Sequence, residues 1–274
     1  MERERASDIQ SPVPGSGCHA PSVPTHLTTA RHLDGLHEAV VAFARYADRA
    51  GLEARVPTCP DWTVRDLVAH QGMVHRWAAA IVRGERPDDE EVESFGAAGR
   101  ASDDPLSWLR DGAAALAEAL TAAPEDLAAV VFLNDAPSAR GFWARRQCHE
   151  TSMHAVDALS ASLGRTPRPD EVWLDPELAG DGIDELLGGF LTRPHSRLRC
   201  EEEAVLVVRP DDLPDWWEVS LGPRPARTAR RTSSDAEPEA DWELTGSAVE
   251  LYLRLWNRTD PPEEWRRLTA VTWG

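Results

Sequence analysis

Residues 142–160, FWARRQCHETSMHAVDALS, constrain the fold of this chain more than any other segment. The apolar residues in this segment recur at spacings of three or more positions and form roughly one stripe, which predicts a helix. Residues 133–137 break the pattern before this helix, and Gly164 is placed to end it. The predicted helix carries two histidines and a glutamate in its middle part.

Helical geometry decides which of these side chains can act together. A helix turns about 100° per residue, so Glu150 and His154, four positions apart, share a face and could grip one ion, whereas His149 points elsewhere. Asp157 is placed to orient the imidazole of His154, and Arg146 is placed to hold the carboxylate of Glu150. Catalytic zinc usually has three protein ligands and one open position, so a third ligand must come from elsewhere. Without it, the pair could equally be a hydrogen bond on a solvated face.

Three more segments have the apolar periodicity of helices that bury one face, namely residues 27–50, 63–83 and 106–123. Capping residues stand at the start of each: Thr28 or Thr29, Asp61 or Thr63, and Asp103 or Asp104. Together with residues 142–160, they predict an antiparallel four-helix bundle. The acidic residues 86–104, rich in glycine and serine, are expected to form a surface loop.

The second of these helices carries His70 near its apolar stripe, and His75 lies five positions further on. A lone histidine on an apolar face is more often a hydrogen-bonded core residue than a ligand. His75 points away from His70 and is expected at the surface. Helical bundles commonly place metal sites on facing helices, so a meeting of His70 with Glu150 and His154 is sterically reasonable.

After the bundle, long helical periodicity gives way to shorter runs, some of them β-branched or alternating. We therefore expect four parts: a disordered arm (1–26), the bundle (27–165), a connecting segment with a helix (166–195) and a C-terminal α/β domain (196–274). Strands are predicted at residues 204–209, 216–221 and 242–244, and a helix begins near residue 245. Residues 222–240 are expected to form a mobile, charge-balanced hairpin loop, although some of their arginines could instead hold a carboxylate ligand. The fold class is therefore α+β.

The composition restricts the partners of this chain. A net charge of −18 over 274 residues argues against nucleic acid or an anionic membrane as the main partner. No run of about 20 apolar residues predicts a membrane span, and no signal peptide is visible. The four cysteines form no C-x-x-C pair, which fits a reducing cytoplasm, and Cys148 is expected to be a small core residue. A monomer is expected, because no long apolar surface stripe stands out.

Two motifs resemble the mycothiol-dependent maleylpyruvate isomerase family. They are VPTCPDWTVRDLVAHQGMVHRWA, from residue 56, and ARRQCHETSMHAVDA, some 70 residues later. The segment TGSAVELYLRLWNR, from residue 245, is similar to the C-terminal signature of the same family. The resemblance implies a DinB-like four-helix bundle followed by a small α/β domain. It also implies that His70 joins Glu150 and His154 as the third metal ligand.

The resemblance further implies an enzyme that uses Zn²⁺, or another divalent metal, together with mycothiol as a thiol cosubstrate. The metal-activated thiolate would attack a small electrophile, either to isomerise an unsaturated acid such as maleylpyruvate or to stay attached as in an S-transferase. One alternative is a metallohydrolase in which zinc-bound water is the nucleophile. Another is a non-catalytic metabolite-binding module, which a closed fourth ligand, His75 or Cys148, would favour.

Overall fold

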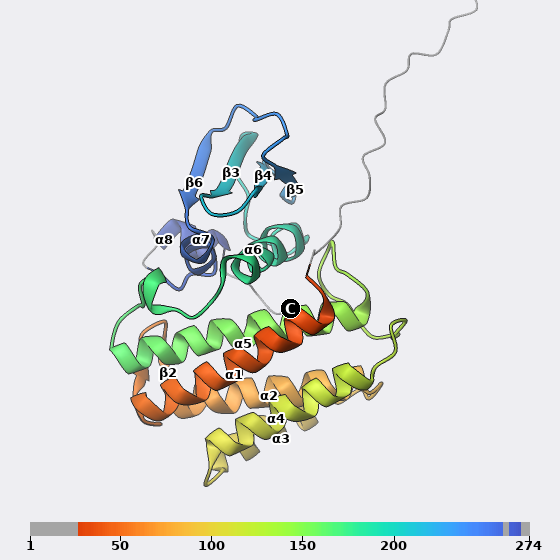
Figure 1. Cartoon of the computed structure of the whole chain (residues 1–274), viewed down its shortest axis with the longest axis vertical. Helices are drawn as coiled ribbons and strands as arrows, with labels where there is room; N and C mark the ends of the chain where they lie inside the picture. Colours follow the sequence, from red (N-terminus) through yellow and green to blue (C-terminus); the bar gives the residue numbers. More distant parts are fainter. Residues whose placement is uncertain (1–26, 260–262, 270–274) are drawn as a thin grey trace, which may run out of the picture.

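The computed structural model describes residues 27–259 and 263–269, so the expected disordered arm, residues 1–26, lies outside the described residues. The N-terminal region is helical, and its long helices lie side by side in the lower part of Figure 1. A short antiparallel hairpin, β1 (Arg55–Val56) and β2 (Cys59–Thr63), leads into the second helix. The helices of this region are α1 (Thr29–Ala50), α2 (Val64–Val82), α3 (Asp89–Ala101), α4 (Pro105–Ala122) and α5 (Ala139–Leu163).

The ends of these helices follow from local side-chain chemistry. The hydroxyl of Thr28 accepts a hydrogen bond from a backbone N–H in the first turn of α1, and Thr63 forms a capping box with Asp66 at the start of α2. Asp104 caps α4. Gly164 ends α5 with φ of 69°, in the left-handed region that glycine adopts without strain. At each of these starts, one of the two predicted capping residues is the one the structure uses.

Residues 86–104 do not form the loop expected from the sequence. Most of this stretch is helix α3, which begins with a capping box between Asp88 and Glu91. Its two buried residues are Gly96 and Gly99, so the helix packs through glycines and has no apolar stripe that a periodicity search could detect. The expectation of a loop was therefore wrong, because a helix whose buried residues are glycines shows no hydrophobic periodicity in the sequence.

The C-terminal region contains a four-stranded mixed sheet with the order β5-β4-β3-β6. Strand β6 runs parallel to β3, and the other neighbours are antiparallel. Figure 1 shows α6 and α7 between this sheet and α5. The elements are η1 (Pro169–Glu171), α6 (Pro176–Asp184), the π-helical turn η2 (Glu185–Phe190), β3 (Ala204–Pro210), β4 (Asp215–Leu221), β5 (Arg227–Thr232), β6 (Trp242–Gly246), α7 (Ala248–Leu255) and α8 (Glu263–Thr269). The predicted fold class is confirmed as a helical N-terminal region followed by a domain with a sheet.

Residues 222–240 also differ from expectation, since they contain strand β5 rather than only a hairpin loop. This strand is made largely of arginine and threonine, and its arginines pair with carboxylates of neighbouring elements. Arg231 contacts Glu218 on β4 at 3.0 Å, and Arg230 contacts Asp184 at the end of α6 at 2.9 Å. This edge strand therefore contacts its neighbours through ion pairs and has no alternation of apolar and polar residues. For this reason its sequence resembled a solvated loop.

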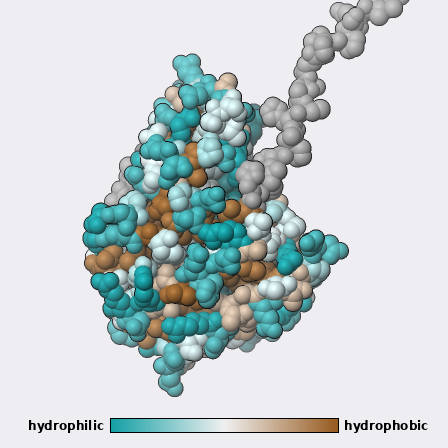
Figure 2. Space-filling model, viewed as in Figure 1, coloured by the Kyte–Doolittle hydropathy of each residue, from teal (hydrophilic) through white to brown (hydrophobic). Residues whose placement is uncertain are grey.

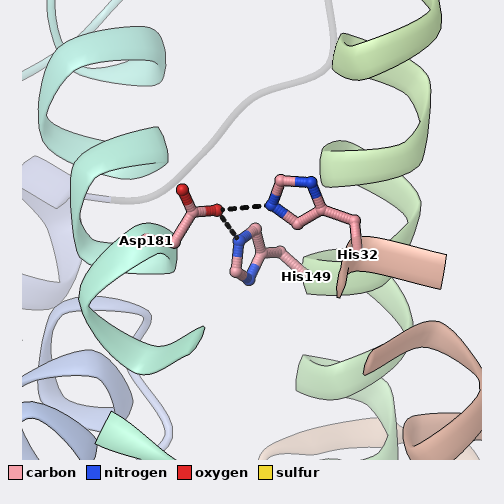
Figure 3. Close-up of side chains that lie close together, drawn as sticks. All are labelled: His32, His149 and Asp181. Atoms are coloured by element: carbon pink, nitrogen blue, oxygen red, sulfur yellow. Dashed lines mark hydrogen bonds and ion pairs between the residues drawn. The ribbon is translucent and has the colours of Figure 1, made fainter. Parts of the chain in front are cut away.

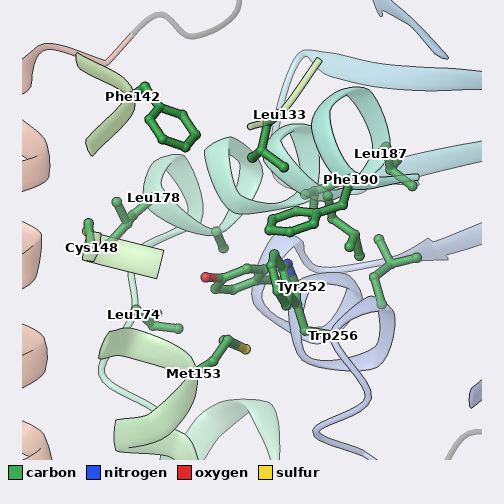
Figure 4. Close-up of a cluster of buried hydrophobic side chains, with 14 of the residues drawn as sticks. Leu133, Phe142, Cys148, Met153, Leu174, Leu178, Leu187, Phe190, Tyr252 and Trp256 are labelled. Carbon is green, nitrogen blue, oxygen red and sulfur yellow. The ribbon is translucent and has the colours of Figure 1, made fainter. Parts of the chain in front are cut away.

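One of two hydrophobic clusters among the described residues joins the helical region to the C-terminal domain, and the other lies within the helical region. Figure 4 shows Met153 of α5 near Tyr252 and Trp256, with Phe190 of η2 close by. Cys148 is fully buried in this core, as expected for a small apolar residue. The middle of α5, which carries the candidate ligands, is thus fixed from the C-terminal side as well as by the bundle.

The visible surface in Figure 2 is mainly hydrophilic, with small hydrophobic patches near the middle of the molecule. Within the described residues, no helix is both long and apolar enough to cross a membrane.

Candidate metal centre

The structure brings together His70 from α2 with Glu150 and His154 from α5. The Nε2 atom of His154 lies 3.4 Å from Oε1 of Glu150, and Nε2 of His70 lies 4.0 Å from the same oxygen. Ligands about 2.1 Å from a tetrahedral zinc ion stand roughly 3.4 Å apart. All three ligand atoms lie within 4.8 Å of one another, so this group could hold a metal ion.

The two residues expected to support these ligands occupy the expected places. Arg146 donates through Nη2 to Oε2 of Glu150 at 2.9 Å, which leaves Oε1 facing the histidines. Nδ1 of His154 lies 2.9 Å from Oδ2 of Asp157. Since the carboxylate accepts this hydrogen bond, Nδ1 carries the proton and Nε2 presents its lone pair to the centre when the ring is neutral.

A further residue, Arg258, supports the site from the C-terminal region, and the sequence did not reveal it. Its Nε and Nη2 atoms donate to the two carboxylate oxygens of Asp157 at 2.9 and 2.8 Å, a bidentate pair. Thr58 donates to Oδ1 of the same carboxylate at 2.6 Å. Asp157 is fully buried, and these contacts fix its orientation. Only the fold could bring Asp157 and Arg258, 101 positions apart in the sequence, into this contact.

The charges of the centre are strongly coupled. Burial would raise the pKa of Glu150, but Arg146 and the two histidines outweigh it and lower this pKa to about 2. Burial would lower the pKa of His154, yet hydrogen bonds to Asp157 and Glu150 raise it to about 9. For His70, burial and the nearby His154 lower the pKa to about 4, so its ring is neutral at pH 7. A cation at the centre would replace the proton that His154 otherwise holds.

The centre opens on a cavity of about 350 Å³ between the helical region and the C-terminal segment. Glu150 and His154 line one wall, and their side chains are only 10% and 11% exposed. Asn257, Arg258 and Arg266 of the C-terminal segment also line this cavity. This volume is within the range of small-molecule sites, so a small ligand could reach the ligand-bearing face of α5.

The indole of Trp62 forms a further boundary of the centre. Its ring centroid lies 4.9 Å from that of His70 and 6.3 Å from that of His154. Trp62 belongs to β2, immediately before α2, and the prolines around it prepare the extended lead-in. The indole of Trp62 therefore restricts rotation of the imidazoles of His70 and His154.

Neither His75 nor Cys148 belongs to this group. The expectation that His75 is at the surface was wrong: it is fully buried, and its Nε2 lies 2.9 Å from the hydroxyl of Thr151 and 3.0 Å from Nε2 of Gln71. Its five-residue offset turns it away from His70, but toward α5 rather than toward solvent. Among the described residues, no fourth histidine, cysteine or carboxylate joins the three ligands.

A second group, His32, His149 and Asp181, could also hold a metal ion, and the sequence did not reveal it. Figure 3 shows His32 of α1 and His149 of α5 pointing toward Asp181 of α6. Their Nε2 atoms lie 2.9 and 2.8 Å from Oδ2 of Asp181, which is hydrogen-bonding distance. Arg145 also donates to this oxygen through Nε at 3.0 Å. Here the guanidinium occupies the same oxygen as the two histidines, whereas Arg146 binds only the outer oxygen of Glu150 and leaves Oε1 to the histidines, so the first group suits a cation better.

Comparisons with known proteins agree with this architecture. Residues 33–159 match the mycothiol maleylpyruvate isomerase N-terminal domain, and residues 177–274 match the MDMPI C-terminal domain. Two crystal structures of the mycothiol-dependent maleylpyruvate isomerase, one of them of a mutant, align with TM-scores of 0.55 and 0.53. Each alignment covers 85% of this chain and 90% of the other, at 15% sequence identity, which establishes a shared fold. A search of curated proteins found no significant match.

Proposed function

Because the chain belongs to the mycothiol maleylpyruvate isomerase family, we propose that it is a metal- and thiol-dependent enzyme acting on a small electrophile. The observation that carries this proposal is the group of His70, Glu150 and His154, of which Glu150 and His154 line a cavity. Two imidazoles and one carboxylate are the donor set of many catalytic zinc sites, and the absence of a fourth ligand among the described residues fits an open position.

The three ligands would hold Zn²⁺ or another divalent cation. Such a cation would supply Lewis acidity that lowers the pKa of a thiol and increases its thiolate fraction at neutral pH. We infer that mycothiol provides this thiol. The reduced thiol pool that such chemistry needs agrees with a cytoplasmic location.

The residues of this chain prepare the site for that chemistry. Asp157 accepts a hydrogen bond from the Nδ1–H of His154 and so directs Nε2 to the centre, and Arg146 leaves only one oxygen of Glu150 turned inward. Trp62 covers the two imidazoles. Arg266, an exposed cation that also lines the cavity, suits an electrophile that carries a carboxylate.

The proposed electrophile is an unsaturated acid resembling maleylpyruvate. In isomerisation the sulfur forms a C–S bond as the C=C π bond opens, rotation follows, and the C–S bond breaks to restore the double bond and the thiolate. In S-transfer the C–S bond remains, and the carbon that received the π electrons takes a proton from solvent. A mass spectrum of the thiol after incubation with candidate electrophiles separates the two, because only transfer leaves an adduct.

Metal analysis tests the centre directly. Purified protein is expected to contain one divalent ion per chain, His154→Ala to lose it, and His32→Ala to keep it. The His32 variant is a matched control, because it removes a buried imidazole from the second group of possible ligands. Equal metal content in the wild type and His154→Ala would remove His154 from the coordination sphere.

Calorimetric titration tests the role of the thiol. Mycothiol is expected to bind the metal-loaded protein and to bind much more weakly after a chelator has removed the ion. An affinity for mycothiol that is the same with and without the chelator would refute contact between the sulfur and the metal. Activity that is independent of added thiol would instead favour a metallohydrolase.

A further inference from the structure

Arg146 is a buried cation shared between two carboxylates. Its Nη2 atom donates to Glu150 at 2.9 Å, and its Nη1 atom forms a short ion pair with Glu185 of η2. The guanidinium carbon lies 5.1 Å from the ring centroids of both Phe190 and Trp256. Three partners of this arginine therefore come from the C-terminal domain, although Arg146 itself belongs to α5.

Arg146 divides its N–H donors between Glu185 and Glu150, and this division determines which oxygen of Glu150 is available to a metal ion. Oε2 accepts from Arg146, whereas Oε1 faces the imidazoles of His70 and His154. A guanidinium can donate two parallel hydrogen bonds to one carboxylate. Glu185 holds Nη1, and Arg146 contacts Glu150 through Nη2 at Oε2, so Oε1 keeps its lone pairs for an ion. Without Glu185, the guanidinium would lose the contact that fixes Nη1 and with it part of the orientation that directs Nη2 to Oε2.

The position of Glu185 is itself unusual. It is the first residue of the π-helical turn η2 and is only 1% exposed. Single π-helical turns are rare and occur often at functional sites. A buried carboxylate is costly unless it is paired, and the pairing partner here is the arginine that orients a candidate ligand. The preceding residue, Asp184, also makes a buried ion pair, with Arg145 of α5, but that pair does not reach the centre.

We propose that Glu185 is a positioning residue that sets the metal ligand Glu150 through Arg146, so that docking of the C-terminal domain completes the metal centre. This inference rests on the proposed function, because it requires metal binding at Glu150. It assigns a role to a residue 35 positions from the ligand that it controls.

The test compares two neighbouring substitutions, Glu185→Gln and Asp184→Asn. Each removes one carboxylate charge from the same interface without a large change in volume. Zn²⁺ affinity is measured by competition with a chromophoric chelator, and the ligand field is read from the visible spectrum of Co²⁺-loaded protein. Denaturation curves report the stability of each variant.

Glu185→Gln is expected to weaken Zn²⁺ binding roughly 10-fold and to change the Co²⁺ spectrum; this is the lower end of the roughly 10- to 100-fold cost of losing a direct partner of a ligand, because Glu185 acts one residue further out, through Arg146. Asp184→Asn is expected to lose stability while it keeps the wild-type affinity and spectrum. If Glu185→Gln does not fold, Glu185→Asp is measured instead; its shorter reach is expected to weaken binding to a lesser degree.

Three results would overturn the proposal. The first is an unchanged Zn²⁺ affinity and Co²⁺ spectrum in the folded Glu185 variant, and the second is an equal loss of affinity in Asp184→Asn. The third is a change in the Co²⁺ spectrum that is the same in both variants once their loss of stability is taken into account. A wild-type protein that binds neither ion would overturn the proposed function as well. Failure of the Glu185 proposal can therefore be told from failure of the proposed function, because in the former case the wild-type protein still binds metal.

Discussion

Replacement of Asp181 by asparagine tests how the helical region and the C-terminal domain are joined. Oδ2 of Asp181 accepts hydrogen bonds from His32 at 2.9 Å, His149 at 2.8 Å and Arg145 at 3.0 Å. The side chains of Asp181 and Arg145 are both only 3% exposed, so the substitution leaves a buried cation short of one counter-ion. Loss of one partner of a buried ion pair costs about 3–5 kcal/mol.

The effect should also depend on pH. Burial raises the pKa of Asp181, but Arg145 and the two histidines outweigh it and hold this pKa well below its usual range. A depressed carboxyl pKa contributes stability above the unfolded pKa of about 3.9, and this contribution is lost as the pH falls toward the folded value. The wild type and Asp181→Asn should therefore differ most near neutral pH and converge in acid.

Urea denaturation and calorimetry measure this difference. For a chain of this size, 3–5 kcal/mol corresponds to a decrease of roughly 6–20 °C in the unfolding midpoint. Glu243→Gln is a suitable control, because it removes a half-exposed partner of Arg209 and should barely change the midpoint. A loss below about 1 kcal/mol for Asp181→Asn would refute the reasoning. Loss of the bound metal ion in this variant would show that the ion occupies the second group of ligands.

Three further predictions concern packing, substrate and metal. Gly72→Ala should destabilise the protein by about 1–3 kcal/mol or more in urea denaturation, because the new Cβ would lie 2.0 Å from the ring of Trp108. An unchanged midpoint would show that the indole moves freely. Arg266→Ala should raise the KM for a carboxylate-bearing electrophile and leave the metal content unchanged, as steady-state kinetics and metal analysis would report; an unchanged KM would remove this arginine from substrate binding. A chelator should lower the unfolding midpoint, since an ion present at 100 times its Kd contributes about 2.7 kcal/mol, and a midpoint that ignores the chelator would argue against a bound ion.

The pairing of Glu150 with His154 could be predicted because it is local. Residues four apart on a helix share a face whatever the rest of the chain does, and the same argument placed Arg146 and Asp157 beside them. The separation of His149 from this face followed from the same angle. The third member, His70, is on another helix, and only the resemblance to a known family assigned it before the structure showed the three side chains together.

Contacts that depend on tertiary packing could not be predicted in this way. Nothing near Glu185 in the sequence indicates that it reaches Arg146, and nothing near Arg258 indicates its pair with Asp157. His75 shows the same limit, since helical geometry gives the direction of a side chain relative to its neighbours but does not say whether another helix lies there. The arginine-rich strand β5 was hidden because its stabilising contacts are ion pairs across elements.

The burial of α5 explains why its chemistry was difficult to read from periodicity alone. Every residue from Phe142 to Ser160 is buried, so this helix has no solvated face, and its polar residues mark contacts on every side. One polar row, which includes Arg146, Glu150 and His154, faces the candidate centre and its supports. A second row, Arg145 and His149, faces the carboxylates of α6. One helix therefore carries both rows: the ion pairs of the second row join α5 to α6, whereas in the first row Arg146 links Glu185 of the same domain to the candidate ligand Glu150.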